Sequence, residues 1–441
     1  MLSAAAQANG TPARIARSIT PTAHNSKIRL FGIFAQDTWS YKKLTLNLGV
    51  RVDHARGWMP EQSKVAGTFS EARDLAETDV FSSWRGVWRT GLVYDLFGSG
   101  QTAIKVSASR YAAQIGLNMV QRVHPFQRTS GTRPWTDNNL DRIPQESELG
   151  AFSGFPGQSS RYGDANGPDW PYSDEFTAGF EHQLVQDIRI GATYYYRTNR
   201  LIIGSRNVAV PPTAYTEHSI GVPAPPAGPG GTVTFYNLQS TFTGRQDNVF
   251  DNEDVLDTTF NGVELTASKR MRDRWQLLAG LTIGKNEGGV LTGDLNDPNN
   301  ALNFPEGIEG TDSAYAFRLS GSYIAPYEIN VSGSFILNDG YPYQSAYAVT
   351  RNAFPTLTRA SQTVRLSRRG DERLPDVTMV DLRISRTFRF SDRRITPMIE
   401  FFNLTNADTV VGFNPNVGTS YLRPTEILSP RLFRFGVSVD F

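Results

Sequence analysis

The chain has 441 residues, no cysteine and a formal net charge of +1, from 44 Lys plus Arg against 43 Asp plus Glu. The balanced charge argues against a protein that binds nucleic acid by neutralising phosphates. The absence of cysteine excludes disulfide scaffolds, thiolate metal sites and cysteine nucleophiles. Aromatic residues reach 11% and glycine 39 positions, yet no apolar run approaches the roughly 20 residues of a membrane helix. This combination is typical of an outer-membrane β-barrel, whose apolar residues are spread over alternating strands.

Segments that alternate between apolar and polar residues recur along the chain. In residues 43–53, one face carries Leu44, Leu46, Leu48, Val50 and Val52, and the other face is polar or small. About ten residues of unbroken alternation match the length of a tilted membrane strand. We predict about thirteen such strands, at residues 28–40, 43–54, 85–97, 101–113, 173–184, 188–202, 257–270, 275–287, 311–325, 327–340, 376–390, 394–404 and 430–441.

Very short polar turns join these strands in pairs, and long connections separate the pairs. Structureless loops of more than about 15 residues are rare in compact soluble domains, whereas short periplasmic turns and long outer loops are typical of transmembrane barrels. The predicted fold is therefore all-β, an antiparallel transmembrane β-barrel with long extracellular loops. The long connections span residues 55–84, 114–172, 203–256, 288–310, 341–375 and 406–429.

The odd strand number is informative, because bacterial single-chain barrels have an even number. The first predicted strand enters a short turn, so it runs toward the periplasm. The last strand follows a long loop, so it also runs inward and leaves the C-terminus in the periplasm. Residues 1–27 supply neither another outward strand nor the apolar core of a signal peptide. We expect residues 1–27 to be the end of an extracellular loop or a disordered start, and residues 28–441 to be the C-terminal part of a longer barrel.

Several strand texts resemble one family. FGIFAQDTWSYKKLTLNLGVRVD (residues 31–53) is similar to the barrel segment of TonB-dependent outer-membrane receptors. RGVWRTGLVYDLFGSGQTAIKVSASRY (85–111), YSDEFTAGFEHQL (172–184), FNGVELTASKRMRDRWQLLAGLTIGKN (260–286), DGYPY (339–343), VDLRISRTFRF (380–390) and EFFNLTN (400–406) resemble the Oar-like subgroup. The resemblance covers nearly the whole chain in order.

The resemblance implies the C-terminal portion, about 13 strands, of a barrel of about 22 strands in the bacterial outer membrane. Family members also have a signal peptide, a plug domain and a TonB-contacting segment, and we place none of these in the chain. The implied function is ligand uptake across the outer membrane, with an unknown substrate. The implied partners are outer-membrane lipid, the barrel assembly machinery, the unknown ligand and, only through the missing N-terminal parts, the TonB complex. We expect no enzyme activity, no cofactor and no nucleic-acid partner.

The final strand, residues 431–441, places an apolar row on one face and ends the chain on an aromatic residue. An apolar terminal strand invites edge pairing unless it closes a barrel. The terminal Phe441 resembles the aromatic residue that the assembly machinery reads in family members. We therefore predict an outer-membrane assembly signal at Phe433, Phe435, Val437, Val439 and Phe441.

Two groups of loop residues are candidate binding positions. The loop at residues 293–303 offers Asp294, Asn296 and Asp297, whose oxygens suit a hard cation such as calcium. The loop lacks the order of an EF-hand, and the same residues also form turns, so a solvated turn is the favoured interpretation. Loop aromatic residues could instead stack on a sugar or an apolar ligand, or could pack the loops and the interfacial girdle. The ligand-contact candidates are Trp170, Tyr172, Tyr341 and Tyr343.

Charged residues on the predicted inner face could line a substrate path, contact a plug or only keep the lumen wet. They are Arg51, Asp53, Glu181, Glu264, Arg383 and Glu400. The five histidines have no metal-ligand spacing. Two alternatives remain: a passive surface adhesin or secretion-associated outer-membrane barrel, and a soluble all-β carbohydrate-binding protein.

Overall fold

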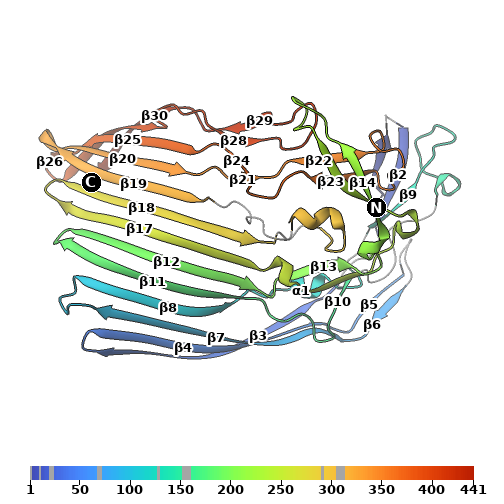
Figure 1. Cartoon of the computed structure of the whole chain (residues 1–441), viewed down its shortest axis with the longest axis horizontal. Coiled ribbons are helices and arrows are strands. Elements are labelled where there is room, and N and C mark those ends of the chain that lie inside the picture. Colours follow the sequence, from blue (N-terminus) through green and yellow to red (C-terminus); the bar gives the residue numbers. More distant parts are fainter. Residues whose placement is uncertain are drawn as a thin grey trace.

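One large antiparallel sheet dominates the computed structural model (Figure 1). The structure describes residues 2–8, 11–18, 24–66, 72–126, 130–150, 160–289, 293–303 and 313–441. The sheet has 14 strands, and we call it the wall. The predicted all-β, antiparallel, barrel-like fold is confirmed. Among the described residues, no helix is long and apolar enough to cross a membrane.

Each predicted strand is present in the wall, where neighbours in sequence are mostly neighbours in space. A short strand, β26 (Phe388–Phe390), continues β25 in the same register along β27. The other wall strands are β3 (Lys27–Tyr41), β4 (Leu44–Met59), β7 (Thr78–Asp95), β8 (Thr102–Ala112), β11 (Tyr172–Val185), β12 (Ile188–Arg200), β17 (Thr258–Arg272), β18 (Trp275–Gly288), β19 (Tyr315–Ala325), β20 (Ile329–Asn338), β25 (Val377–Arg386), β27 (Arg393–Phe402) and β30 (Leu432–Asp440).

The predicted turns lie together at one end of the wall, and the C-terminus lies at that end (Figure 1). Tight reversal requires left-handed backbone, and two turns place consecutive non-glycine residues there. Asp273 and Arg274 have φ of 54° and 71°, and Tyr327 and Glu328 have φ of 63° and 60°. Asp273 and Arg274 are the two residues between the paired Arg272 and Trp275, and positive φ at both matches the twist of strands that a two-residue turn connects. The other turn is longer by one residue, because Ala325 pairs with Ile329.

Apolar residues on the outer face of the wall are exposed, as lipid-facing residues of a membrane barrel should be. Val50 is 60% exposed and Val437 is 64% exposed. Large aromatic residues gather near the short turns, where they form a belt suited to a membrane interface. Exposed members of this belt are Trp39, Tyr41, Tyr94, Phe97, Trp275, Tyr323, Tyr327 and Phe390.

The wall has two edges. Among the described residues, β3 pairs only with β4, and β30 pairs only with β27. The two edge strands lie at opposite sides of the wall (Figure 1). Phe31 on β3 is 54% exposed, and Phe435 on β30 is 76% exposed.

The connections opposite the turns are more ordered than the sequence indicated. Strands β4 and β7 extend beyond their predicted ends at residues 54 and 85, and small sheets fill the loops. Their strands are β5 (Gln62–Lys64), β6 (Arg73–Leu75), β9 (Ser130–Pro134), β10 (Ser160–Tyr162), β13 (Ile203–Asn207), β14 (Tyr215–Gly221), β15 (Thr232–Leu238), β16 (Asn248–Asn252), β21 (Pro342–Tyr343), β22 (Ala346–Thr350), β23 (Ser361–Arg365), β24 (Glu372–Arg373), β28 (Val410–Phe413) and β29 (Pro424–Ile427). Short helices are α1 (Asn118–Gln121), η1 (Glu146–Glu148), η2 (Pro212–Ala214), η3 (Ser240–Phe242), η4 (Asp254–Leu256) and η5 (Pro298–Asn303), whereas η6 (Pro326–Glu328) lies in a turn of the wall.

The N-terminal segment is part of this loop layer. Strands β1 (Leu2–Ala8) and β2 (Thr11–Ser18) form a hairpin, and β2 pairs with β9. The hairpin therefore lies at the end of the wall opposite the turns (Figure 1). The division of the chain at residue 27 stays a prediction.

Hydrophobic packing is concentrated in the loop layer. The largest cluster, which we call the loop core, joins the outer ends of β4 and β7 to α1 and the β10–β11 connection. Phe81 and Val120 at its centre are 1% and 0% exposed. Its members are Ala55, Met59, Val80, Phe81, Ile115, Met119, Val120, Val123, Tyr162 and Trp170. The loop core is thus built from loop residues together with the outer ends of two wall strands.

Candidate functional site

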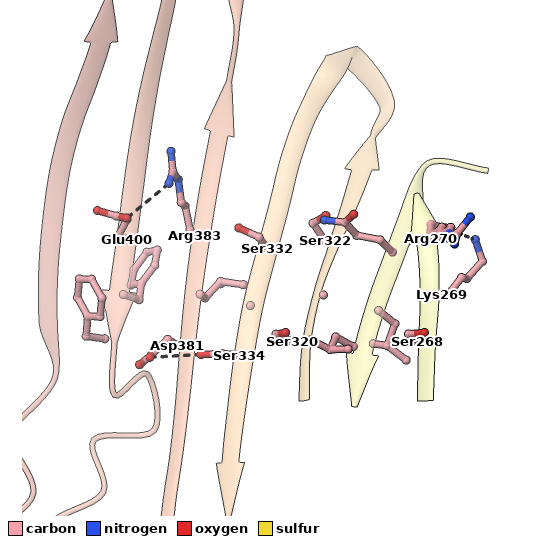
Figure 2. A pocket seen from close by; sticks show the side chains of 18 residues that line it. Ser268, Lys269, Arg270, Ser320, Ser322, Ser332, Ser334, Asp381, Arg383 and Glu400 are labelled. Atoms are coloured by element: carbon pink, nitrogen blue, oxygen red, sulfur yellow. Dashed lines mark hydrogen bonds and ion pairs between the residues drawn. The ribbon is translucent and has the colours of Figure 1, made fainter. Parts of the chain in front are cut away.

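Strand register arranges polar side chains in rows across the inner face of the wall. Directly paired residues point to the same face of a sheet. One row therefore crosses six strands, through Gln276, Ser322, Ser332, Arg383, Glu400 and Arg434. A parallel row runs through Ser268, Leu278, Ser320, Ser334 and Asp381. Figure 2 shows most of these side chains around a hollow of about 650 Å³.

An ion-pair network occupies one end of the first row. Glu400 is 8% exposed, and its carboxylate lies 4.0 Å from the Arg383 guanidinium and 2.5 Å from that of Arg434. In the second row, the Ser334 hydroxyl donates to Asp381 Oδ2 at 3.3 Å (Figure 2). Hydroxyl, carboxylate and guanidinium groups at this spacing can exchange hydrogen bonds with water or with a polar solute.

The other inner-face charges also have partners, on the same strand or on a neighbouring one. Arg51 pairs with Asp53 at 2.7 Å, and the Tyr195 hydroxyl donates to Glu264 Oε2 at 3.0 Å. Glu181 pairs with Lys105 at 2.5 Å and with Arg189 at 3.7 Å. Each charge singled out in the sequence is therefore part of a polar pair, which keeps the inner face hydrophilic.

The first two aromatic candidates lie at the start of β11, with Trp170 in the preceding connection and Tyr172 as the first residue of the strand. Trp170 is 5% exposed and lies in the loop core, where its Nε1 donates to the Ala113 carbonyl oxygen at 2.7 Å. The ring of Tyr172 lies 5.0 Å from the Arg85 guanidinium carbon and 4.0 Å from that of Arg110. Both residues thus have structural contacts, which favours packing over ligand contact.

The other two aromatic candidates lie on the connection between β20 and β22. Tyr341 is 52% exposed. The ring of Tyr343 meets Phe413 edge-on, with the centroids 4.4 Å apart, and burial, followed by Glu372, raises its pKa. Tyr341 is the most solvent-exposed of the four aromatic candidates.

The carboxylates of the loop at residues 293–303 are occupied by donors of this chain. Asp294 Oδ1 accepts hydrogen bonds from the backbone N–H groups of Asn207 and Asn296, at 2.9 and 3.0 Å. Asp297 Oδ2 pairs with Arg359 at 2.7 Å. Asn296 also donates, from Nδ2 to the Asn207 carbonyl oxygen at 3.0 Å. These contacts favour the turn interpretation over cation binding.

A different acidic group escaped the sequence reasoning. Oxygens of Asp137, Asp141 and Glu148 lie within 4.8 Å of one another, which makes this the one such group among the described residues. Its signal was present in the spacing Asp-x-Asn-x-Asp at residues 137–141, followed by Glu148.

A buried histidine follows Val123 of the loop core. His124 is 4% exposed, and its Nδ1 accepts a hydrogen bond from the Phe126 N–H at 3.0 Å. Burial, followed by the neighbouring His24, lowers the pKa of His124 to about 4. The unfolded value is about 6.5, so the unfolded chain takes up a proton at a pH where the folded loop does not.

We expect the loop core to lose stability as the pH falls from about 6.5 to about 4. The check is hydrogen–deuterium exchange of residues 116–124 at several pH values, corrected for the intrinsic pH dependence of exchange. A His124→Asn variant should flatten this dependence. An unchanged slope in that variant would assign the pH dependence to another group.

The fold and the inner face define a class of protein, an outer-membrane β-barrel. The chain belongs to the family described as "Outer membrane beta barrel domain", whose model matches residues 3–338. The predicted location, the bacterial outer membrane, is confirmed. This membership excludes the soluble carbohydrate-binding alternative.

One curated relative is the TonB-dependent transporter Oar of Myxococcus xanthus. The two sequences are 24% identical over 420 residues, which cover 85% of this chain and 35% of the relative. The chain thus spans about a third of the length of that relative. The predicted resemblance to TonB-dependent receptors of Oar-like type is confirmed.

Solved structures show the same fold. The siderophore receptor PiuA from Acinetobacter baumannii has a TM-score of 0.50 at 12% identity, over 94% of this chain and 43% of PiuA. The FrpB iron transporter from Neisseria meningitidis (F3-3 variant) has a TM-score of 0.50 at 11% identity, over 94% of this chain and 46% of FrpB. These relatives are transporters and receptors, not enzymes.

Proposed function

We propose that this chain forms part of a TonB-dependent transporter barrel that takes up a ligand across the outer membrane. The observation that carries the proposal is the polar inner face, whose rows run from Gln276 to Arg434 across six paired strands. A lipid-facing apolar outer face and a polar inner face are what a solute path through a membrane requires.

The loop layer is the proposed place of ligand capture. Loops carry binding residues when a rigid scaffold positions them, and here the β21–β24 pair and a hydrogen bond from the Leu374 N–H to the Tyr341 carbonyl oxygen, at 3.0 Å, position the Tyr341 segment. The exposed Tyr341 is the best candidate for ligand contact, because Trp170 and Tyr172 have structural contacts. No step in this scheme involves covalent chemistry, and the substrate class is left open.

Energy coupling is proposed to come from the TonB complex through segments outside this chain. The outer-membrane lipid would contact the outer face, and the barrel assembly machinery would recognise the final strand. In that strand, Phe433, Phe435, Val437, Val439 and Phe441 all remain exposed, which suits the proposed assembly signal. We expect the complete barrel to have about 22 strands.

Depletion of compounds from the growth medium tests the proposed uptake. Cells that produce the full protein are compared with cells that lack it, and mass spectrometry follows small molecules and peptides in the medium. We expect at least one compound to be depleted only by producing cells, and a protonophore to stop the depletion. A Tyr341→Ala variant should slow depletion without changing the amount of folded barrel.

Two results would contradict uptake. Equal depletion by cells with and without the protein would contradict the proposed transport function. Retention of a compound at the cell surface, unaffected by the protonophore, would favour the passive adhesin.

A further inference from the structure

The segment between β9 and η1 has the residue order of a calcium-binding loop. Counted from Asp137 as the first position, Asn139 is third, Asp141 is fifth and Glu148 is twelfth. These are the positions at which an EF-hand loop supplies side-chain oxygens, and the seventh supplies a backbone carbonyl. Ile143 occupies the seventh position.

The folded segment brings these positions together. Oxygens of Asp137, Asp141 and Glu148 converge within 4.8 Å. The sixth position of an EF-hand loop makes a sharp turn on glycine. Here Arg142 makes that turn in the left-handed region, with φ of 59°, and its backbone N–H donates to Asp137 Oδ2 at 3.0 Å.

One oxygen in the group has no donor. Asp137 Oδ1 is buried and accepts no hydrogen bond from the described residues. A buried carboxylate oxygen without a partner carries a desolvation cost that a bound cation would remove. This orphan oxygen is independent of the residue spacing, and it belongs to the residue that supplies the first ligand of a calcium loop.

Basic side chains do not neutralise the group within the described part of the chain. Arg133 pairs instead with Glu146, at 2.6 Å, and Arg142 contributes its backbone N–H rather than an ion pair. Glu148 accepts hydrogen bonds from Trp135 Nε1 at 3.1 Å and from the Asn138 N–H at 2.9 Å. These bonds orient the Glu148 carboxylate. Asp141 also accepts hydrogen bonds, from the Ile143 N–H at 2.7 Å and from Asn139 Nδ2 and Gln145 Nε2 at 2.9 Å each. All of these donors are neutral, so the three negative charges stay close together without a cation, unlike Asp297, which is paired with Arg359.

We propose that Asp137, Asn139, Asp141, Ile143 and Glu148 form a calcium site in the outer loop layer. All of the proposed metal-ligating atoms are oxygens, so the site would not prefer soft metals. Calcium accepts six to eight oxygens in flexible geometry, whereas magnesium demands a near-ideal octahedron and keeps several waters. Extracellular calcium modules bind with dissociation constants of about 10⁻⁴ to 10⁻³ M, and we expect this range here.

A bound ion would connect distant parts of the loop layer. The site follows β9, and β9 pairs with β2 of the N-terminal hairpin. Trp135 and Leu149 flank the site in sequence and pack with Ile15 of β2. Calcium would therefore fix the β9–η1 segment and, through these contacts, hold the N-terminal hairpin against the loop layer.

Sensitised terbium luminescence tests the site, because the Trp135 indole N–H donates a hydrogen bond directly to Glu148, one of the proposed ligand residues. The full protein is purified in detergent and stripped with EGTA, and Tb³⁺ is added under excitation of tryptophan. We expect emission that Ca²⁺ displaces and that an equal concentration of Mg²⁺ does not. Asp141→Asn and Glu148→Gln should each weaken binding at least about tenfold.

Two control variants make the result specific. Asp294→Asn, in the other acidic loop, should bind as the unaltered protein does. Trp135→Phe should lose the sensitised emission and, because it also removes the hydrogen bond that orients Glu148, should weaken calcium binding measured by calorimetry less than Glu148→Gln does. Unchanged binding in Asp141→Asn and Glu148→Gln, loss of binding in Asp294→Asn, or equal displacement by Mg²⁺ would each overturn the proposal.

Proteolysis of the unaltered protein gives a test that needs no variant. Arg142 lies within the loop and is exposed, so trypsin can cleave after it. We expect millimolar Ca²⁺ to slow this cleavage at least about tenfold relative to EGTA, since proteases cut transiently opened segments. Equal cleavage rates with Ca²⁺ and with EGTA would contradict an ion bound at this loop.

Discussion

Replacement of Val437 by arginine is expected to destabilise the folded barrel by about 2–4 kcal/mol, the cost of a cation at the lipid-facing midplane. Val437 is 64% exposed on the outer face near the middle of β30. It also belongs to the proposed assembly signal. We therefore expect most of the Val437→Arg protein to fail to reach a folded state in the outer membrane.

The neighbouring residue provides a matched control. Ser438 lies at nearly the same depth in β30 but on the opposite, inner face, where it pairs with Thr396. Ser438→Arg should fold almost as the unaltered protein does, because water in the lumen solvates the charge. Heat-modifiable gel migration and urea titration in lipid vesicles measure both variants. Equal loss of folded protein in the two would show that the outer face does not meet lipid.

Truncation of Phe81 to alanine is expected to destabilise the loop layer by about 3–5 kcal/mol, as in other cores that lose a buried phenylalanine. Phe81 is 1% exposed at the centre of the loop core. Close approach of Gly57 and Gly167, where added Cβ atoms would lie 2.3 and 2.4 Å from Phe81, shows how tightly the ring is enclosed. The wall strands from β17 to β20 should remain folded, because none of their residues belongs to this core.

Hydrogen–deuterium exchange separates the two parts in the Phe81→Ala protein. Residues 116–124 should lose most of their protection, whereas the strands from β17 to β20 should keep theirs. Phe97→Ala is the control, because Phe97 lies on a turn at the other end of the wall and is 66% exposed. If the wall strands and the loops lost protection together, the loop core would not be a separate cooperative unit.

The wall could be predicted from the sequence because the alternation of apolar and polar residues is a local pattern. Alternation over residues 43–53 assigns each side chain to a face without any knowledge of the partner strand. The same rule stops at the membrane boundary. The outer end of β4 lies beyond the predicted limit because residues His54 to Met59 do not alternate simply between apolar and polar residues.

The loop layer could not be predicted in this way, because its contacts are distant in sequence. Strand β10 pairs with β16 in parallel, with Ser160 opposite Asn248, and no local pattern indicates that partner. Phe81 and Val120 belong to one cluster in the folded chain, and no local pattern indicates this contact either. The group at Asp137 differs from the other loop contacts, because the spacing of its acidic residues can be read from the sequence. The partners of the inner-face charges could not be identified without the register between the strands.

The bare edges of β3 and β30 constrain how the wall can enter a bilayer. Hydrocarbon offers no hydrogen bonds, so each unpaired backbone group costs several kcal/mol there. Along β30, from Leu432 to Asp440, that cost would far exceed the net stability of an ordinary domain. Insertion and edge pairing must therefore be a single event. Phe441 and its neighbours would reach lipid only once another strand has taken the free side of β30.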